Sequence, residues 1–290
     1  MQVAQTVAQM RALAAQVRQR DEIIGLVPTM GALHAGHTSL IDQARSQCNC
    51  VVVSVFVNPT QFGPAEDFKQ YPRPFEKDLA ICERYNVDVV FAPPAEEMYP
   101  VPSLTWVTVQ ELTEPLCGRS RPGHFRGVTT VCTKLFNITQ PHFAYFGQKD
   151  AQQALVIERM VADLNMPVEI VVCPIVREED GLAISSRNQY LDEQQRKDAT
   201  VLYRALSHVR TRIKAGRRDV RQLVAEMRGI MEQVPSVSVE YVSIVDSATL
   251  AEVKEITGRV LIAVAAAVGP TRLIDNILVD VPSTDDTMKP

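Results

Sequence analysis

Short apolar runs alternate with segments of helical length along the first 176 residues, and this alternation constrains the fold more than any other feature. The run at 51–57, VVVSVFV, is apolar except for Ser54, which is typical of a parallel strand buried on both faces. Strands that alternate with helices of ten or more residues indicate βαβ units and one parallel sheet. The expected strands and helices follow one another at 22–28, 37–48, 51–57, 74–85, 87–91, 126–138, 143–146, 150–164 and 168–176.

The stretch before the first of these strands has its apolar residues at helical spacing and lacks the apolar core of a signal peptide. These residues are Val3, Val7, Met10, Leu13 and Val17. The longest apolar run of the chain, at 260–268, is far shorter than the ~20 residues that span a bilayer. We therefore expect an N-terminal helix, and neither secretion nor membrane insertion.

The pattern changes after residue 176. Two polar-rich helices are expected at 192–215 and 219–233, and three strands with short connections are expected at 237–245, 259–268 and 272–279. This order is typical of an α+β domain. We therefore predict a domain boundary near residue 176, with domains at 1–176 and 177–290. The polar tail from about residue 282 is expected to be disordered.

Charge and cysteine content narrow the possible functions. The chain has 290 residues with 30 basic and 34 acidic side chains, a net charge of −4, so nothing in the bulk charge favours binding to nucleic acid or to an anionic membrane. The six cysteines form no CxxC pair. We interpret them as reduced thiols that fill the core of a cytosolic protein; a zinc site is the alternative, but the ligand spacing is lacking.

A histidine pair follows the first strand of the expected sheet, in the sequence PTMGALHAGH at 28–37. A junction between a strand and a helix presents backbone N–H groups and the positive end of a helix dipole to an anion. Gly31 and Gly36 permit close backbone approach, and His34 and His37 are spaced to face one phosphate. A satisfied pair of loop histidines is the alternative. Zinc binding by the pair lacks a nearby cysteine or carboxylate to complete a ligand set.

Polar side chains also follow the next strand. Asn58 and Gln61 lie in the segment VNPTQFG at 57–63, and loops at the carboxyl ends of parallel strands form the ligand crevice of an open sheet. The basic segment RSRPGHFRGV at 119–128 precedes a helix. It is interpreted as a mobile lid that touches phosphates, or else as an ordinary solvated loop.

A third junction, FGQKDAQQ at 146–153, again joins a strand to a helix. Lys149 is placed to meet a phosphate, Asp150 to accept a hydrogen bond from a ribose hydroxyl, and Gln153 to face the crevice one turn later. Simple capping of the helix by Lys149 and Asp150 is the alternative. At the domain boundary, Ser185, Ser186 and Arg187 offer two hydroxyls and a guanidinium fork suited to triphosphate oxygens.

Together these segments resemble the pantothenate synthetase (pantoate–β-alanine ligase) family of the HIGH-type nucleotidyltransferase superfamily. The resemblance is collinear to about Leu191 and weaker through the C-terminal domain. One departure is Ile184, where the family more often has methionine; because the backbone makes the expected nucleotide contact there, we expect activity to be unaffected. The segments that carry the resemblance are 28–37, 56–73, 121–136, 146–153 and 177–191.

The resemblance implies an enzyme of pantothenate and coenzyme A biosynthesis. ATP and (R)-pantoate would give pantoyl-adenylate and pyrophosphate, and β-alanine would then attack the adenylate to give pantothenate and AMP. It implies a Rossmann-like domain for ATP and pantoate, and a smaller domain that closes over the site. Mg²⁺ held mainly by the phosphates, no dedicated metal ligands, a cytoplasmic location and a homodimer complete the expectation.

The resemblance also implies roles for individual residues. His34 and His37 would bind the ATP phosphates and stabilise the departing pyrophosphate, with His37 as proton donor; Lys149 and Arg187 complete the catalytic set. Gln61 and Gln153 would hold pantoate, and Gln61 would also lie near β-alanine. The residues expected around ATP are Met30, Gly31, Ala32, Leu33, His34, Ala35, Gly36, His37, Gly147, Gln148, Lys149, Asp150, Val176, Ile184, Ser185, Ser186 and Arg187.

Two other functions compete with this one. A related nucleotidyltransferase would leave the nucleotide on a phosphorylated acceptor and would need no amine. A non-catalytic nucleotide sensor would bind ATP without turnover, although the presence of His34, His37, Lys149 and Arg187 argues against it.

Overall fold

The computed structural model describes residues 1–64, 66–100 and 103–281. The chain divides into two compact units: the first is Met1–Val176, and the second begins at Arg177. The predicted disordered tail from about residue 282 lies outside the described residues. No helix in the described ranges is long and apolar enough to cross a membrane.

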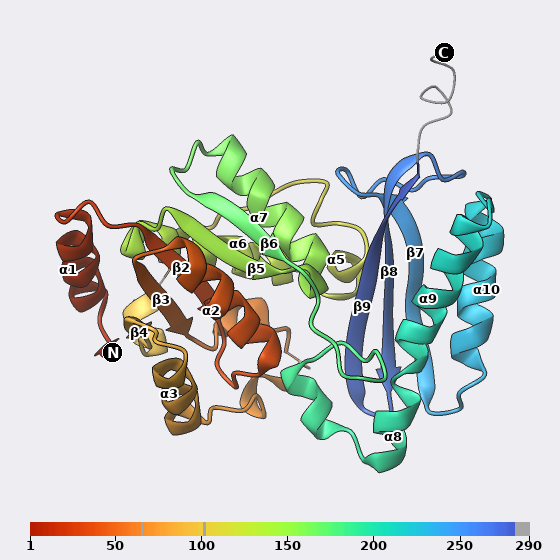
Figure 1. The fold of residues 1–290 in the computed structure, drawn as a ribbon, viewed down its shortest axis with the longest axis horizontal. Coiled ribbons are helices and arrows are strands. Elements are labelled where there is room, and N and C mark those ends of the chain that lie inside the picture. The colour runs from red at the N-terminus through yellow and green to blue at the C-terminus, as the bar shows by residue number, and fades with distance from the viewer. Residues whose placement is uncertain (65, 101–102, 282–290) are drawn as a thin grey trace. The chain divides into compact units, whose positions relative to one another are not determined.

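The first unit is built on a six-stranded sheet in which every neighbouring pair of strands is parallel (Figure 1). The strand order is β1-β4-β3-β2-β5-β6. The predicted α/β class is confirmed. The strands are β1 (Gln2–Ala4), β2 (Ile24–Thr29), β3 (Cys50–Val55), β4 (Val89–Phe91), β5 (Phe143–Gly147) and β6 (Glu169–Cys173).

Helices cover both faces of this sheet. On one face, Leu40, Ile41 and Ala44 of α2 and Cys82 of α3 pack with alternate residues of β3 in one apolar cluster. On the other face, α6 packs against α1, α7 and β2. This two-sided burial explains why the β3 sequence is apolar without alternation. The helices of the unit are α1 (Val7–Arg18), α2 (Ala35–Gln47), α3 (Phe75–Arg84), α4 (Ala95–Met98), α5 (Cys117–Ser120), α6 (His124–Thr139) and α7 (Ala151–Asp163), with 3₁₀ turns η1 (Pro59–Gln61), η2 (Asp67–Lys69) and η3 (Gln148–Asp150).

The order of the strands creates a switch point between β2 and β5. From β2 the chain continues to β3 and β4 on one side, and it then returns to β5 and β6 on the other side. In open α/β sheets, ligands bind outside the carboxyl ends of the strands at such a point. Of the four segments that the sequence singled out in this unit, those at 28–37, 57–63 and 146–153 follow the adjacent strands β2, β3 and β5, and the one at 119–128 precedes α6.

The N-terminal prediction was incomplete because a strand precedes the helix. β1 pairs with β4 at the edge of the sheet. Its three residues are too few to show an alternating pattern, and Val3 also fits the helical spacing. The helix itself starts with a capping box, in which the side chain of Thr6 accepts from Gln9 N and the Gln9 side chain accepts from the backbone N–H of Thr6.

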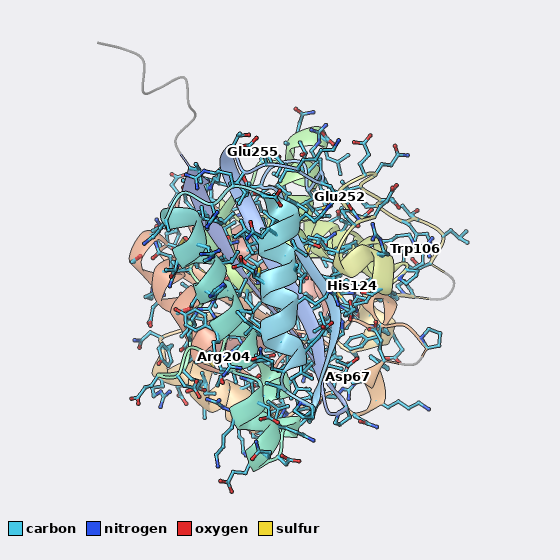
Figure 2. The ribbon with its side chains drawn as sticks, turned by 90° about the vertical axis from the view of Figure 1, so that its right-hand side faces the viewer. Asp67, Trp106, His124, Arg204, Glu252 and Glu255 are labelled. Carbon is cyan, nitrogen blue, oxygen red and sulfur yellow. The ribbon has the colours of Figure 1, made fainter. Side chains whose placement is uncertain are left out.

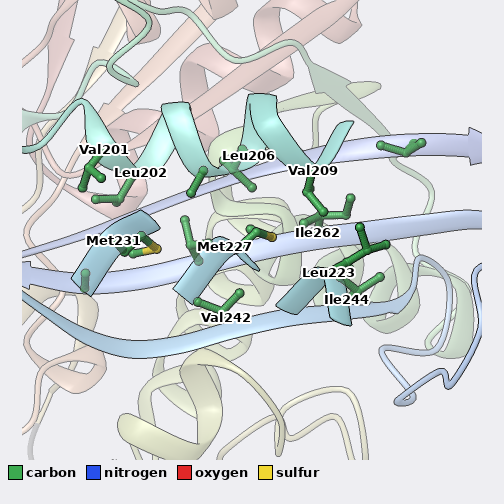
Figure 3. Packing of buried hydrophobic residues seen from close by; sticks show 14 of the residues in the cluster. Val201, Leu202, Leu206, Val209, Leu223, Met227, Met231, Val242, Ile244 and Ile262 are labelled. Atoms are coloured by element: carbon green, nitrogen blue, oxygen red, sulfur yellow. The ribbon is translucent and has the colours of Figure 1, made fainter. Parts of the chain in front are cut away.

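The second unit contains a three-stranded antiparallel sheet, β7 (Val237–Asp246), β8 (Gly258–Val268) and β9 (Thr271–Val281), with order β7-β8-β9. Side chains of α9 (Val201–Lys214) and α10 (Val220–Glu232) meet those of the strands in one buried cluster (Figure 3). The predicted single helix at 192–215 was wrong, because Ala199 and Thr200 separate α8 (Glu193–Asp198) from α9.

All six cysteines are free and buried, as the sequence suggested. Burial raises the pKa of the Cys50, Cys82 and Cys132 thiols to about 12, so these side chains stay protonated and unreactive. Cys48 Sγ lies 3.3 Å from the hydroxyl of Tyr145 inside the core.

Alanine at Cys48, Cys50 or Cys117 is expected to leave the turnover number within a few-fold of wild type, because buried thiols act here as small apolar side chains. The measurement is the steady-state rate of the reaction that the family resemblance implies, with a thermal melt to confirm folding. A folded variant without turnover would contradict the core-filling role.

Candidate active site

The loop after β2 has an unusual backbone. Gly31 and Ala32 adopt left-handed conformations, with φ of 80° and 51°. A Cβ atom at Gly31 would lie 2.9 Å from Asp78 Oδ2 and 3.1 Å from Val55 Cγ1, so only glycine fits there. Asp78 comes from α3, and its carboxylate accepts hydrogen bonds from Ala32 N at 2.9 Å and Leu33 N at 2.8 Å.

These bonds correct one expectation from the sequence. The junction was expected to offer its backbone N–H groups to an anion, but those of Ala32 and Leu33 bind Asp78, and that of Gly31 donates to Thr29 Oγ1 at 3.1 Å. The next part of the junction is the start of α2, where His34 is the N-cap residue and its side chain makes no capping hydrogen bond. The imidazole of His34 is therefore not tied to the helix end.

The two histidines of the motif stack on each other. Their ring centroids are 4.0 Å apart, and their planes differ by 24°. The Nδ1 atoms of both rings are buried and have no hydrogen-bond partner in the described part of the chain. Burial, with a smaller contribution from the charge of Lys149, lowers the pKa of His34 to about 4; burial, His34 and Lys149 hold the pKa of His37 well below 6.5. A pair of buried, unpartnered polar atoms is what an absent polar ligand would leave.

These shifts predict that the fold loses stability in acid. The pKa of His34 is about 4 in the folded chain against an ordinary 6.5, so the unfolded chain binds more protons between these pH values. The free energy of unfolding should therefore fall as the pH falls from about 6.5 towards 4. Urea titrations across this range measure it. His34→Gln should flatten the slope of the free energy of unfolding against pH. Equal slopes in wild type and His34→Gln would contradict the burial of His34.

Lys149 and Asp150 reach the histidines from the next strand. They lie in η3 directly after β5, and Lys149 Nζ is 3.9 Å from Asp150 Oδ2. The positive charge of Lys149 contributes to the lowered pKa of both imidazoles, and the charge of Asp150 opposes it at His34. The β2 and β5 junctions thus gather one ammonium and two imidazoles at the switch point, a set suited to an anionic ligand.

Gln61 connects the β3 loop to the histidine loop. Gln61 is buried, with only 8% of its surface exposed. The side-chain Oε1 accepts from Asn58 Nδ2 at 3.1 Å, and Nε2 donates to the sulfur of Met30 at 2.9 Å. Asn58 Nδ2 also donates to the carbonyl oxygen of Gly127. A Cβ atom added at Gly127 would lie 2.4 Å from the carbonyl oxygen of Thr60. The turn that carries Gln61 is therefore packed tightly onto α6.

The basic segment at 119–128 also holds Gln61. Arg121 forms two bonds with the Glu66 carboxylate, at 2.8 and 2.6 Å. His124, at the start of α6 (Figure 2), donates from Nδ1 to the Gln61 carbonyl at 2.8 Å and lies with Nε2 3.0 Å from Arg121 Nη1. Burial and Arg121 lower the pKa of His124 to about 4. The segment was interpreted as a lid that touches phosphates or else as a solvated loop; its Arg121 guanidinium is paired with the Glu66 carboxylate here.

Gln153 lies half-buried in the first turn of α7, three residues after Asp150. Its neighbour Gln152 has a structural part: it accepts from Cys117 N at 3.0 Å and donates to the Leu112 and Pro115 carbonyls. Gln152 thus holds the backbone at 112–117, and Gln153 is the glutamine that the sequence analysis expects to face the crevice.

Of the other predicted residues, Ala35 and Gly36 begin α2, Gly147 ends β5 and Gln148 begins η3. Val176 ends the first unit, and the second unit carries Ile184, Ser185, Ser186 and Arg187. Ser185 caps the 3₁₀ turn η4 (Ser186–Tyr190) and accepts from Arg187 N at 3.3 Å. Arg177, at the start of this unit, makes bonds of 2.6 and 2.9 Å to the buried Asp275 of β9 and donates to the Gly181 carbonyl. This clamp fixes the beginning of the segment that leads to Ser185.

The sequence pattern did not reveal Asp78, which lies at a core position of α3, four residues before Cys82, and is 1% exposed. The only available signal was a charged residue on the apolar side of a predicted helix. Among the described residues, no group of three or more histidine, cysteine, aspartate and glutamate side chains could hold a metal ion.

Comparison with known proteins agrees with this arrangement. The family model for pantoate–β-alanine ligase matches residues 2–278. The chain belongs to the pantoate–β-alanine ligase family. Pantothenate synthetases of Moorella thermoacetica and Acetivibrio thermocellus are 56% and 53% identical to it over 281 residues each, covering 97% of this chain and 99% and 100% of those proteins.

Solved structures of pantoate–β-alanine ligases share the fold. The pantothenate synthetase of Thermus thermophilus matches with a TM-score of 0.91 and 46% identity, over 96% of this chain and 99% of that one. The Francisella tularensis ligase, complexed with beta-gamma ATP and beta-alanine, matches with a TM-score of 0.79 and 34% identity over 96% and 97%. The chain is thus a ligase of pantoate and β-alanine, and neither the related nucleotidyltransferase nor the sensor describes it.

Proposed function

We propose that the ligase works in two steps through pantoyl-adenylate. The pantoate carboxylate attacks the α-phosphorus of ATP and pyrophosphate leaves; the amine of β-alanine then attacks the acyl carbon of the adenylate, and AMP leaves with formation of pantothenate. The observation that carries this proposal is the stacked pair of buried histidines with unpartnered Nδ1 atoms beside the charge of Lys149. ATP and β-alanine as ligands are also those of the Francisella tularensis relative.

The first step depends on charge. Negative charge develops on the transferring group and on pyrophosphate, so preorganised cations and donors carry the catalysis. Lys149, His34 and His37 are proposed to bind the phosphates, with His37 donating a proton towards the leaving group. A bound triphosphate would raise the pKa of both imidazoles, since nearby negative charge favours their protonated form. The pantoate carboxylate is already ionised and needs no general base.

The other substrate contacts are proposed as follows. Gln61 and Gln153 hold pantoate, with Gln61 also near β-alanine. The second unit is proposed to close over the site and to bind the ATP phosphates through Ser185, Ser186 and Arg187. ATP is proposed to lie among Met30, Gly31, Ala32, Leu33, Ala35, Gly36, Gly147, Gln148, Asp150, Val176 and Ile184, in addition to the residues that bind its phosphates.

Mg²⁺ is proposed to enter with ATP, held mainly by phosphate oxygens, where it would neutralise part of the phosphate charge. Asp150, half exposed beside Lys149, is a carboxylate whose charge acts on His34 in the proposed phosphate site. The homodimer and the cytoplasmic location implied by the family resemblance stay predictions, and light scattering of the purified protein measures the former.

A product assay tests the proposed route. ATP, pantoate and β-alanine are supplied together, and each is then omitted in turn. AMP and pyrophosphate should appear in equal amounts with pantothenate, and pantoate with ATP alone should support exchange of labelled pyrophosphate into ATP. ADP and phosphate as the stoichiometric products would overturn the adenylate mechanism.

A further inference from the structure

Asp78 contacts the loop that leads into the histidine motif. It is 1% exposed, and each of its two carboxylate oxygens accepts one backbone N–H: Oδ2 from Ala32 at 2.9 Å and Oδ1 from Leu33 at 2.8 Å. Hydrogen bonds to an ionised acceptor are stronger than neutral ones. One side chain of α3 therefore fixes two successive peptide groups of the loop after β2.

The backbone that Asp78 fixes is intrinsically unfavourable. Ala32 has a φ of 51°, and the left-handed region is disfavoured for every residue with a Cβ atom. Gly31 before it is also left-handed. Without the two bonds from Asp78, the loop would lose the main contact that opposes relaxation of Ala32.

The loop leads directly into the catalytic pair. Leu33, which donates to Asp78, is followed by His34, the N-cap of α2, and His37 lies in the first turn of that helix. The other end of α2 is held separately, because Arg45 in its last turn bonds to the carboxylate of Asp88 at 2.6 Å. The two ends of α2 thus have different carboxylate anchors, and only Asp78 lies at the end that carries the histidines.

We propose that Asp78 is a positioning residue for phosphate transfer: it holds the Gly31–Leu33 backbone so that His34 and His37 stack in the orientation that meets the phosphates of ATP. It touches no reacting atom and acts through the loop. This proposal rests on the proposed function, in which the two histidines bind those phosphates.

Asp78→Asn keeps the shape of the side chain but places an NH₂ group opposite one backbone N–H, so only one of the two bonds can persist. We expect the rate of pantoate-dependent pyrophosphate–ATP exchange to fall about 10²-fold, as a misplacement of about 1 Å can cause. Formation of pantothenate from supplied pantoyl-adenylate and β-alanine should stay within a few-fold of wild type. Asp88→Asn is the matched control, because it removes a carboxylate that binds Arg45 and Val51 N at the opposite end of α2.

A second substitution separates positioning from general stability. Ala32→Gly removes the penalty on the left-handed backbone, so in the Asp78→Asn background it should restore about 5- to 10-fold of the lost exchange rate. In the wild-type background it should change that rate less than twofold. If Asp78→Asn fails to fold, Ala32→Val, which keeps Asp78 and disfavours the same backbone, should show the loss in exchange instead.

Proton NMR of the histidine rings without ligand gives a readout independent of activity. Asp78→Asn should abolish the ring-current shifts of the stacked pair, and Asp88→Asn should retain them. Unchanged ring shifts, exchange within a few-fold of wild type, or equal losses in both half-reactions without rescue by Ala32→Gly would each overturn the positioning role. If wild-type protein makes pantothenate without exchange, only the proposed adenylate route is overturned. The ring shifts and the overall rate of pantothenate formation would then still show whether Asp78 positions the two histidines.

Discussion

Replacing Lys149 by alanine is expected to slow pantoyl-adenylate formation by about 10²-fold or more, the loss typical of removing one preorganised charge-stabilising group. The structural reason is the state of its neighbours. Burial and Lys149 itself keep His34 and His37 neutral in the absence of ligand, so the ammonium is the group in this cluster that is charged before ATP arrives. Pyrophosphate–ATP exchange measures the step.

Two observations accompany this loss. Without the ammonium, the pKa of both imidazoles should rise, because the charge of Lys149 lowers them in wild type. The remaining activity of Lys149→Ala should therefore have its optimum at a higher pH than that of wild type. Lys197→Ala, which removes an exposed lysine paired with Glu193 in the second unit, is the control and should be unaffected. Exchange within a few-fold of wild type would remove Lys149 from the phosphate site.

Gln61→Glu is expected to weaken pantoate binding strongly and to leave ATP binding nearly intact. Pantoate is an anion whose carboxylate must stay reactive, so neutral amides suit it better than a tight guanidinium pair, which would stabilise the ground state. Gln61 is buried against Asn58 and Met30, so a new carboxylate there would be poorly hydrated and would repel the substrate.

Calorimetric titration with each ligand separately decides the role of Gln61. A loss of pantoate affinity with unchanged ATP affinity is the expected result. Gln43→Glu, at an exposed position on α2, adds the same charge to the same unit and should alter neither. Unchanged pantoate affinity, or an equal loss for both ligands, would show that Gln61 does not contact pantoate.

The sheet could be predicted because each central strand is buried on both faces and each is followed by a helix with a clear apolar side. β1 could not, since three residues at an edge carry no period of their own and its partner, β4, is distant in the sequence, with Gln2 opposite Val89. The break between α8 and α9 was missed because Ala199 and Thr200 carry no glycine or proline signal.

The candidate site likewise has residues that the sequence could predict and residues that it could not. Residues at the ends of adjacent strands, such as His34 and Lys149, could be brought together from topology alone. The contacts that support them could not, because Asp78 and His124 act through backbone groups of other loops, and a backbone partner leaves no trace in a sequence. The pairing of Arg121 with Glu66 also depends on two segments whose approach only the fold determines.

The Arg177 clamp has a consequence for the order in which a nascent chain becomes active. Arg177 and its partner Asp275 are 98 positions apart, whereas the last strand of the parallel sheet ends at Cys173. During synthesis, the sheet with its histidines and Lys149 can form while the ribosome still holds everything after it. The segment that carries Ser185 and Arg187 gains its anchor only when β9 has emerged. A ribosome-bound chain is therefore expected to assemble the histidine pair and Lys149 of the first unit well before the segment with Ser185 and Arg187 is anchored in the second.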